Sequence, residues 1–87
     1  MKQFQVYYNE FLVGVLYINE QNEYRYICNA DILDKISMTD PVAPALYNEQ
    51  NEFGTPIPYF QVRVEANERF NDIEMGFVND AVRLKAF

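Results

Sequence analysis

The sequence predicts a small α+β domain, in which a three-stranded antiparallel meander is covered by one or two helices and followed by a long proline-containing loop. Three observations support this class. Apolar and polar residues alternate in the first third of the chain, apolar residues return at helical spacing after residue 29, and four prolines bracket a polar stretch further on. With 87 residues the chain suits one domain, so residues 1–87 are taken as a single unit.

The first two strands are predicted to form a hairpin. Residues 3–8 alternate between polar and apolar side chains, Asn9-Glu10 provides the turn, and residues 11–18 are a run of β-favouring apolar residues. Gly14 lies inside this run with apolar neighbours on both sides. This position indicates a β-bulge or a close approach by another backbone rather than a turn.

A third strand is predicted after the polar turn at residues 19–22. Residues 23–28 alternate again and place Tyr24, Tyr26 and Cys28 on one face. A meander of this size can leave one face in water, so the other face needs a cover of helix or loop.

Residues 30–36 predict a short helix that supplies part of this cover. Ile32, Leu33 and Ile36 are spaced for one helical face. Asn29 is the expected N-cap, and the carboxylate of Asp31 complements the helix dipole in the first turn.

The next segment, residues 41–58, predicts a loop, because it is polar and carries no hydrophobic period between its prolines. Near the C-terminus, residues 73–78 suit a short strand and Asn79-Asp80 a turn. Residues 82–86 fit either a final edge strand or a helical turn.

The apolar residues of segment 58–70 fit both the period of a strand and the period of a helix. Phe60, Val62 and Val64 alternate as in a strand, whereas Ile57, Phe60 and Val64 follow helical spacing. A threonine suited to capping and a proline in the first turn favour the helix.

The composition excludes several classes of site. No histidine is present, and a single cysteine, Cys28, forms neither an intramolecular disulfide nor a zinc site. The three glycines are isolated, so phosphate-binding loops are absent. The carboxylate pairs Asp31/Asp34 and Glu65/Glu68 have the spacing of solvated helix faces, and Cys28 suits a small core residue. We therefore expect no enzyme, no catalytic residue, no cofactor and no metal.

The net charge of the chain indicates which classes of partner it favours. Thirteen acidic residues against seven basic ones give a net charge of −6, which disfavours direct binding of nucleic acid. Most of the excess lies in residues 31–80, where a solubilising surface is the first interpretation and a docking face for a basic partner the second. No secretory signal or membrane span is apparent, so we expect a soluble, cytoplasmic protein that does not bind membranes.

Two further features suggest a protein partner. Seven tyrosines are too many to bury with satisfied hydroxyls, and exposed tyrosine is typical of interfaces, although half-buried strand positions also use it. The first and third strands, if unpaired on one side, would present edges able to accept another chain.

Several motifs follow one another in an order that is known from one family. Val6-Tyr7-x-Asn9 leads into Val13-Gly14-x-Leu16, and then come an aromatic strand at residues 24–26, a serine-containing stretch that ends in proline at 36–41, and a proline-aromatic segment at 56–60. This pattern resembles the N-terminal subdomain of HipA-type proteins. Asp40 stands where that family usually has leucine, and residues 67–70 replace its closing Pro-Glu-Gly.

The resemblance implies a role without catalysis. The family's catalytic residues lie in a larger C-terminal portion, so none is carried over. A HipA N-terminal-like domain of this kind, similar to the small HipS-like protein of three-component toxin–antitoxin systems, would bind and restrain a bacterial HipA-type Ser/Thr kinase.

For this protein-interaction module the expected partner contacts are Tyr59, Phe60 and Val64. The alternative is an acidic, phage-encoded inhibitor that mimics nucleic acid and blocks a defence nuclease. The sequence predicts no oligomeric state.

Overall fold

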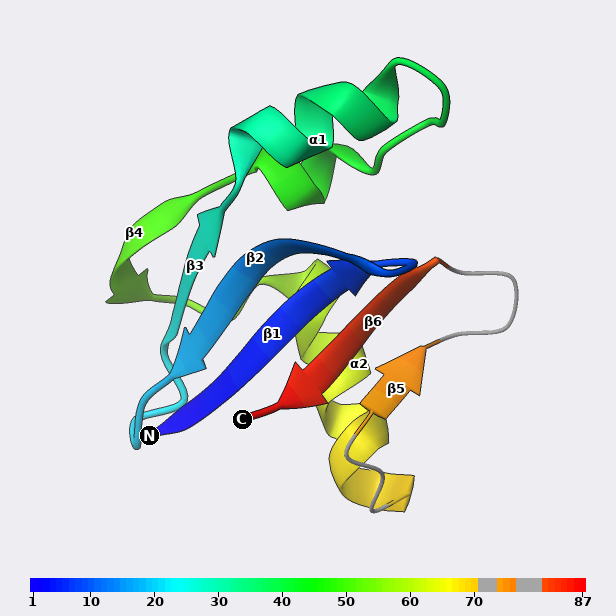
Figure 1. Ribbon diagram of the computed structural model, residues 1–87. Helices are drawn as coiled ribbons and strands as arrows, with labels where there is room; N and C mark the ends of the chain where they lie inside the picture. The colour runs from blue at the N-terminus through cyan, green and yellow to red at the C-terminus, as the bar shows by residue number, and fades with distance from the viewer. Residues whose placement is uncertain (71–73, 77–80) are drawn as a thin grey trace.

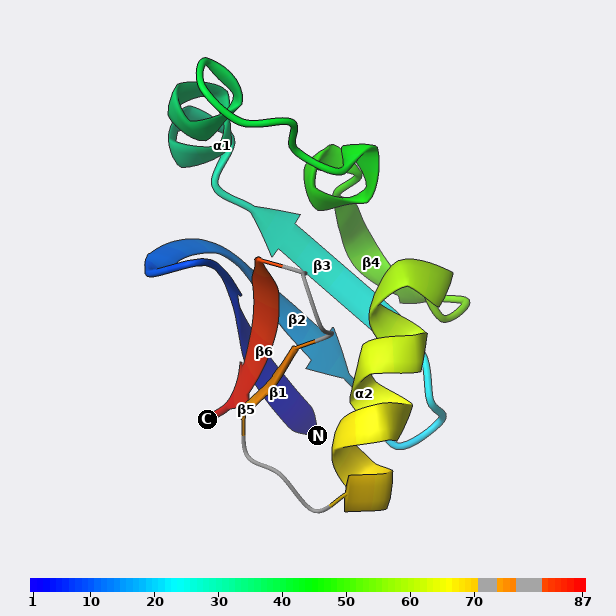
Figure 2. The same ribbon diagram turned by 90° about the vertical axis from the view of Figure 1, so that its right-hand side faces the viewer.

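The computed structural model describes residues 1–70, 74–76 and 81–87, and it confirms a small α+β domain. Within those residues, six strands form one antiparallel sheet in the order β4-β3-β2-β1-β6-β5. Helix α2 covers one face of the sheet, whereas α1 and the 3₁₀ turn η1 lie beyond one end of its strands (Figures 1 and 2). The elements are β1 Lys2–Tyr8, β2 Phe11–Ile18, β3 Tyr24–Cys28, α1 Ala30–Ser37, η1 Pro44–Tyr47, β4 Gln50–Gly54, α2 Pro58–Phe70, β5 Glu74–Gly76 and β6 Val82–Ala86.

The predicted meander is confirmed. β2 pairs with β1 on one side and with β3 on the other. Asn9 and Asn22 in the connecting turns have positive φ values of 52° and 60°. Asparagine tolerates this left-handed conformation better than most residues, because its short polar side chain bonds locally to the backbone.

The condition under which β1 and β3 would present open edges is not met. β1 pairs with β6 on its second side, and β3 pairs with β4. Residues 82–86 are therefore a strand, as one of the two alternatives held, but this strand lies between β1 and β5 instead of at the edge. β5 falls within the short strand predicted at 73–78; the rest of that segment and the turn at Asn79-Asp80 lie outside the described residues.

The loop predicted at residues 41–58 is only partly a loop, because it contains η1 and β4. β4 pairs with β3 across a register shift between Tyr24 and Tyr26. The pairing rests on backbone hydrogen bonds, which need no hydrophobic period, so the sequence pattern did not reveal the strand. Leu46 of η1 is fully buried.

Both interpretations of Gly14 are supported by its surroundings. The register between β1 and β2 shifts next to it, because Val6 pairs with Gly14 and Tyr7 with Leu12. A Cβ on Gly14 would lie 2.6 Å from the Tyr26 ring and 2.9 Å from the Ile27 carbonyl oxygen. Only glycine allows the third strand to approach this closely.

The two predicted helices are confirmed. The side chain of Asn29 accepts a hydrogen bond from the Ile32 N–H and caps α1, whose Leu33 and Ile36 are buried. α2 begins at Pro58 and buries Phe60 and Val64 against the sheet. No helix in the described part of the chain is long and apolar enough to cross a membrane.

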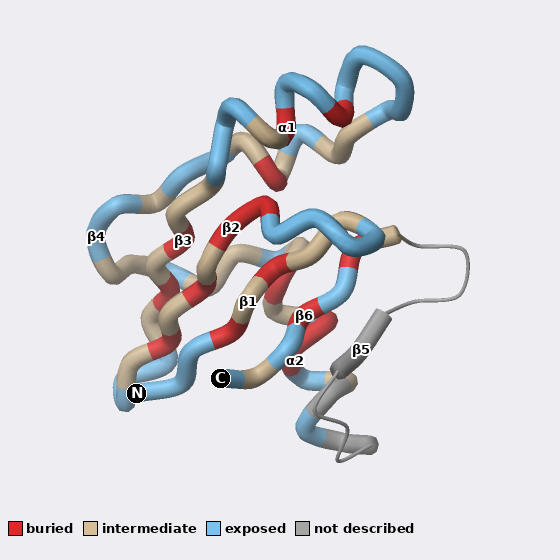
Figure 3. The backbone as a smooth tube through the Cα atoms, viewed as in Figure 1, coloured by how far each residue is buried: buried red, intermediate tan, exposed pale blue. Residues whose placement is uncertain are grey.

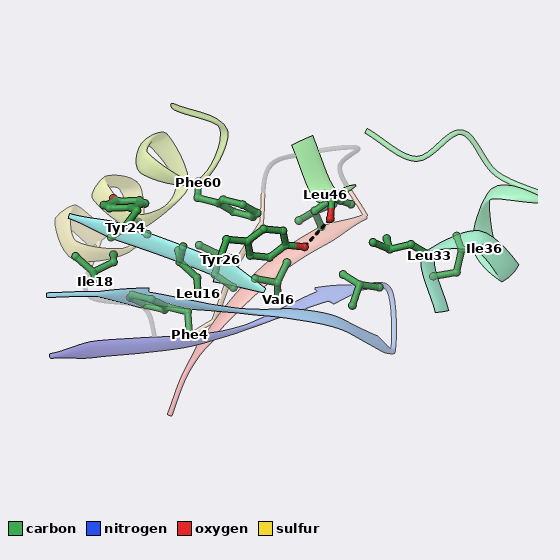
Figure 4. Packing of buried hydrophobic residues seen from close by; sticks show 14 residues of the cluster. Phe4, Val6, Leu16, Ile18, Tyr24, Tyr26, Leu33, Ile36, Leu46 and Phe60 are labelled. Atoms are coloured by element: carbon green, nitrogen blue, oxygen red, sulfur yellow. Dashed lines mark hydrogen bonds between the residues drawn. The ribbon is translucent and has the colours of Figure 1, made fainter. Parts of the chain in front are cut away.

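The core lies between the sheet and α2. Along β1 and β6, buried positions alternate with more exposed ones (Figure 3). Tyr26 occupies the centre: its ring centroid is 4.6 Å from that of Phe60, and its hydroxyl donates a 2.8 Å hydrogen bond to the Leu46 carbonyl (Figure 4). The other core residues are Phe4, Val6, Val13, Leu16, Ile18, Tyr24, Leu33, Ile36, Val64, Val82 and Leu84.

Burial changes the acidity of two core tyrosines. It raises the pKa of Tyr24 from 10.0 to about 12, with a further contribution from the carboxylates of Glu65 and then Glu68. Burial likewise raises the pKa of Tyr26 far above the ordinary value. Both phenols therefore stay protonated in the folded state at pH values where an unfolded chain loses the proton.

Replacing Phe60 with alanine is expected to lower the free energy of unfolding by about 3–5 kcal/mol, because it removes a buried ring and leaves a cavity. The matched control is Val62→Ala, two residues along the same helix, where the side chain is 52% exposed. That change is expected to stay within about 0.5 kcal/mol. Urea unfolding measures both, and equal effects would contradict the burial assigned to Phe60.

Replacing Gly14 with alanine is expected to destabilise the domain by about 1–3 kcal/mol, because the new methyl group overlaps the Tyr26 ring and the β3 backbone. Gly54→Ala is the control, since a Cβ there would meet only the end of the Gln50 side chain, at 3.2 Å. Thermal unfolding compares the two variants. A Gly14→Ala protein as stable as Gly54→Ala would show that β3 does not approach β2 as described.

The ionisation of these two phenols is expected to leave the free energy of unfolding unchanged below pH 10.0. It is expected to lower the free energy of unfolding as the pH rises toward about 12. The sign follows because the unfolded chain releases the Tyr24 proton first, which stabilises the unfolded state. Urea unfolding across this alkaline range, on the natural chain and on Tyr24→Phe, measures the effect. The variant should lose less stability, and identical slopes would contradict the raised pKa.

Candidate functional site

The two carboxylate pairs of the helices lie at the surface. Asp31 and Asp34 are exposed on α1, and Glu65 is exposed on α2, as their spacing predicted. Glu68 pairs with Lys2 of β1 in an exposed ion pair. Among the described residues, no group of three or more His, Cys, Asp or Glu side chains is placed to hold a metal ion.

Cys28 lies at the end of β3 and packs partly against the core. Its thiol donates a hydrogen bond to Glu49 Oε1 at 3.4 Å, and its backbone N–H donates to the same oxygen at 3.1 Å. Burial, together with this hydrogen bond and the negative charge of Glu49, raises the pKa of the thiol. The arrangement favours the protonated, unreactive form and agrees with the predicted structural role.

Of the three predicted partner contacts, Phe60 and Val64 need correction, whereas Tyr59 stays a prediction. Phe60 and Val64 are buried in the core, so neither side chain contacts a partner while the domain is folded. Tyr59 is half-buried beneath the guanidinium of Arg63, which lies 3.8 Å from the ring centroid. The helical spacing that joins Phe60 to Val64 marks the face of α2 turned toward the sheet, which is why these residues are core residues.

All seven tyrosines are buried or half-buried. Tyr24 and Tyr26 are buried, and the other five are half-buried. Tyr17, for example, lies on the sheet face that α2 leaves uncovered, with the Arg25 guanidinium 5.5 Å from its ring centroid. Five of the seven tyrosines lie in strands, as the second of the two interpretations held.

The structure instead exposes apolar side chains where the β1–β2 hairpin meets α1. A hollow of about 510 Å³ opens there between the two elements. Phe11, which is 51% exposed, lines it from the start of β2. The other lining residues are Tyr8, Asn9, Ile32, Lys35, Ile36, Thr39 and Asp40. We call this the α1 hollow.

The register explains why Phe11 is exposed. Phe11 pairs with Tyr8, and Tyr8 also pairs with Val82, which is buried. Cross-strand partners share a face, so Phe11 lies on the same side of the sheet as the core. The β1–β2 turn extends past α2 (Figure 1), and Phe11, which directly follows that turn, is left 51% exposed.

Sequence reasoning missed the α1 hollow, because Phe11 looks like any other apolar residue of a strand. One available signal was its place directly after the Asn9-Glu10 turn, at the outer end of the hairpin. Met38, 83% exposed just beyond α1, is another large exposed apolar side chain, although it does not line the hollow. An apolar cluster of this kind at the surface is typical of a protein–protein contact.

Comparison with known proteins finds no family model, no curated protein and no solved structure that matches this chain.

Proposed function

We propose that this protein is a non-catalytic interaction module that binds a partner protein through the α1 hollow. The observation that carries the proposal is the exposed ring of Phe11 beside an open apolar cavity. Leaving this surface in water costs free energy, and a partner that covers it recovers the free energy. Aromatic side chains at such sites commonly contribute most of the binding energy.

We further propose that the partner is a HipA-type Ser/Thr kinase of a bacterial toxin–antitoxin system. The support is the motif order of residues 6–41 and 56–60, which resembles the N-terminal subdomain of that family. The fold is compatible with a separate domain, because α2 and the sheet enclose a hydrophobic core.

The proposed mechanism is occupancy. The module needs no reactive group of its own, because a bound domain restrains a kinase by holding one of its surfaces in a single arrangement. Restraint then scales with the fraction of kinase molecules that carry the module, so loss of affinity and loss of restraint are expected together.

A second candidate is the acidic inhibitor that mimics nucleic acid. One observation favours it: five exposed carboxylates stand between the start of α1 and the end of β4, against the single cation Lys35. They are Asp31, Asp34, Asp40, Glu49 and Glu52. Binding led by charge falls steeply as salt rises, whereas binding led by an apolar contact is less sensitive.

Replacing Phe11 with serine is expected to weaken binding to a co-expressed HipA-type kinase from the same genome by about 2 kcal/mol, because the ring is the central apolar contact. Isothermal titration calorimetry measures affinity, and autophosphorylation of the kinase measures restraint. The control is Val62→Ser, which removes an equally exposed apolar side chain from α2, outside the hollow.

The proposal predicts that only the Phe11 variant loses binding and restraint, at both low and moderate ionic strength. Equal binding by the two variants would contradict the α1 hollow as the contact. Loss of binding at moderate ionic strength in the natural chain would instead favour the acidic inhibitor.

A further inference from the structure

Two sets of hydrogen bonds hold the walls of the α1 hollow in place. On the hairpin side, the backbone N–H of Asn9 donates a 2.8 Å hydrogen bond to the Ala81 carbonyl. The guanidinium of Arg83 donates a second bond, of 2.9 Å, to the Asn9 carbonyl. Both bonds tie the β1–β2 turn to β6 and to the residue before it. The turn that leads into Phe11 is therefore anchored to a neighbouring strand.

The opposite wall is anchored at the end of α1. The Ile36 carbonyl accepts hydrogen bonds from the backbone N–H groups of Thr39 and Asp40, at 3.0 and 2.9 Å, and from the Thr39 hydroxyl at 3.2 Å. These bonds turn the chain as it leaves the helix, so that Asp40 lines the hollow together with Lys35. Because both walls are anchored, the hollow is already formed in the free domain, as binding sites usually are.

The charged residues that line the hollow balance each other. In the described part of the chain they are Lys35, a cation of α1, and Asp40, an anion of the turn that follows. Both are exposed, and neither forms an ion pair with another described residue. The hollow therefore offers a hydrogen-bond donor and a hydrogen-bond acceptor without net charge, beside the apolar side chains of Phe11, Ile32 and Ile36.

We infer that the α1 hollow binds a polypeptide segment by one large apolar side chain and the backbone beside it, without selecting for charge. The inference rests on the proposed function and names what the partner presents at this site. The apolar side chain fills the hollow. The Lys35 ammonium donates to a backbone carbonyl of the segment, and the Asp40 carboxylate accepts from a backbone N–H. Every residue except proline carries such a donor and such an acceptor on its backbone, with no net charge.

Other occupants use this surface less fully. The phosphates of a nucleic acid gain at Lys35 but are repelled by Asp40 and by the net charge of −6. A segment with only cationic or only anionic flanks likewise gains at one of these two residues and loses at the other. A small molecule inside the hollow leaves the outer part of the Phe11 ring in water, whereas a polypeptide continues past the opening and covers it.

The probe is an acetylated and amidated peptide with one central phenylalanine among serine and asparagine residues. It is titrated into the isotope-labelled natural chain, and NMR shift changes give the affinity and the residues contacted. Three further peptides of equal length carry serine in place of phenylalanine, flanking lysines, or flanking glutamates. We expect shift changes at residues 8–11 and 32–40 and no binding of the serine peptide.

The two charged peptides test the lack of charge selection. At physiological ionic strength a Debye length of about 8 Å screens the net charge of the chain, so only charges close to the peptide act on it. The lysine and glutamate peptides are therefore expected to bind within about threefold of each other. A larger preference for either one would show that one sign of charge dominates at the hollow.

The backbone contact is tested by N-methylation of the peptide, which removes one N–H at a time. Methylation of the N–H that meets Asp40 is expected to weaken binding to the natural chain about fivefold. The Asp40→Ala variant should bind the methylated and the parent peptide equally. Glu52→Ala is the matched control, because Glu52 is exposed on β4, does not line the hollow and changes the net charge equally. The control should respond as the natural chain does.

The outcomes separate this inference from the proposed function. Three results overturn the inference: no binding of the phenylalanine peptide, a charge preference above about threefold, or a methylation effect that is missing or survives Asp40→Ala. Acetyl-phenylalanine amide that binds as tightly as the peptide also overturns it, because a small molecule then suffices. A kinase that binds the natural chain while the peptides fail leaves the proposed function standing without the inference. Peptides that bind as expected, without kinase binding, support the inference and remove the kinase as the partner.

Discussion

The packing of Tyr26 is the constraint on which the rest of the fold depends. Its ring fills the space that Gly14 leaves open, and it packs against Phe60, so one side chain joins β2, β3 and α2. Its hydroxyl donates to the Leu46 carbonyl and holds η1 at the end of the sheet. A buried hydroxyl without a partner costs about 1–3 kcal/mol, so the position of η1 and the burial of Tyr26 depend on each other.

The α1 hollow exists because α2 is shorter than the strand β2 that it covers. A helix of the 13 residues of α2 spans roughly 20 Å, whereas the eight residues of β2 span roughly 26 Å, so α2 does not cover the whole strand. The end of the hairpin is left to α1, which begins where β3 ends. Because α1 covers Tyr8 and Phe11 only in part, an apolar hollow remains. The feature that we propose as the binding site is therefore the part of the core face that the main helix does not cover.

The sequence showed that the protein is acidic, but it did not show which apolar side chains lie near the acidic residues. The carboxylates of Asp31, Asp34 and Asp40 were visible as part of an acidic stretch, and a docking role for a basic partner was one of two interpretations. Folding brings only Asp40 of these three to the hollow that Phe11 lines, and Lys35 lines the same hollow. The predicted contacts Phe60 and Val64 were misassigned because helical periodicity identifies an apolar face without showing what covers it.

Local sequence determined the elements whose signals are local. Strand alternation, the asparagine turns, the Asn29 cap and the proline start of α2 each act within a few residues, so the meander and both helices could be predicted. The tertiary structure alone decided that β4 pairs with β3, that β6 inserts between β1 and β5, and that Phe11 stays at the surface. Strands pair through backbone hydrogen bonds that almost any residue offers, so local periodicity does not show which strands become neighbours. The exposure of a side chain depends on what packs against it in the folded domain, which local periodicity does not show either.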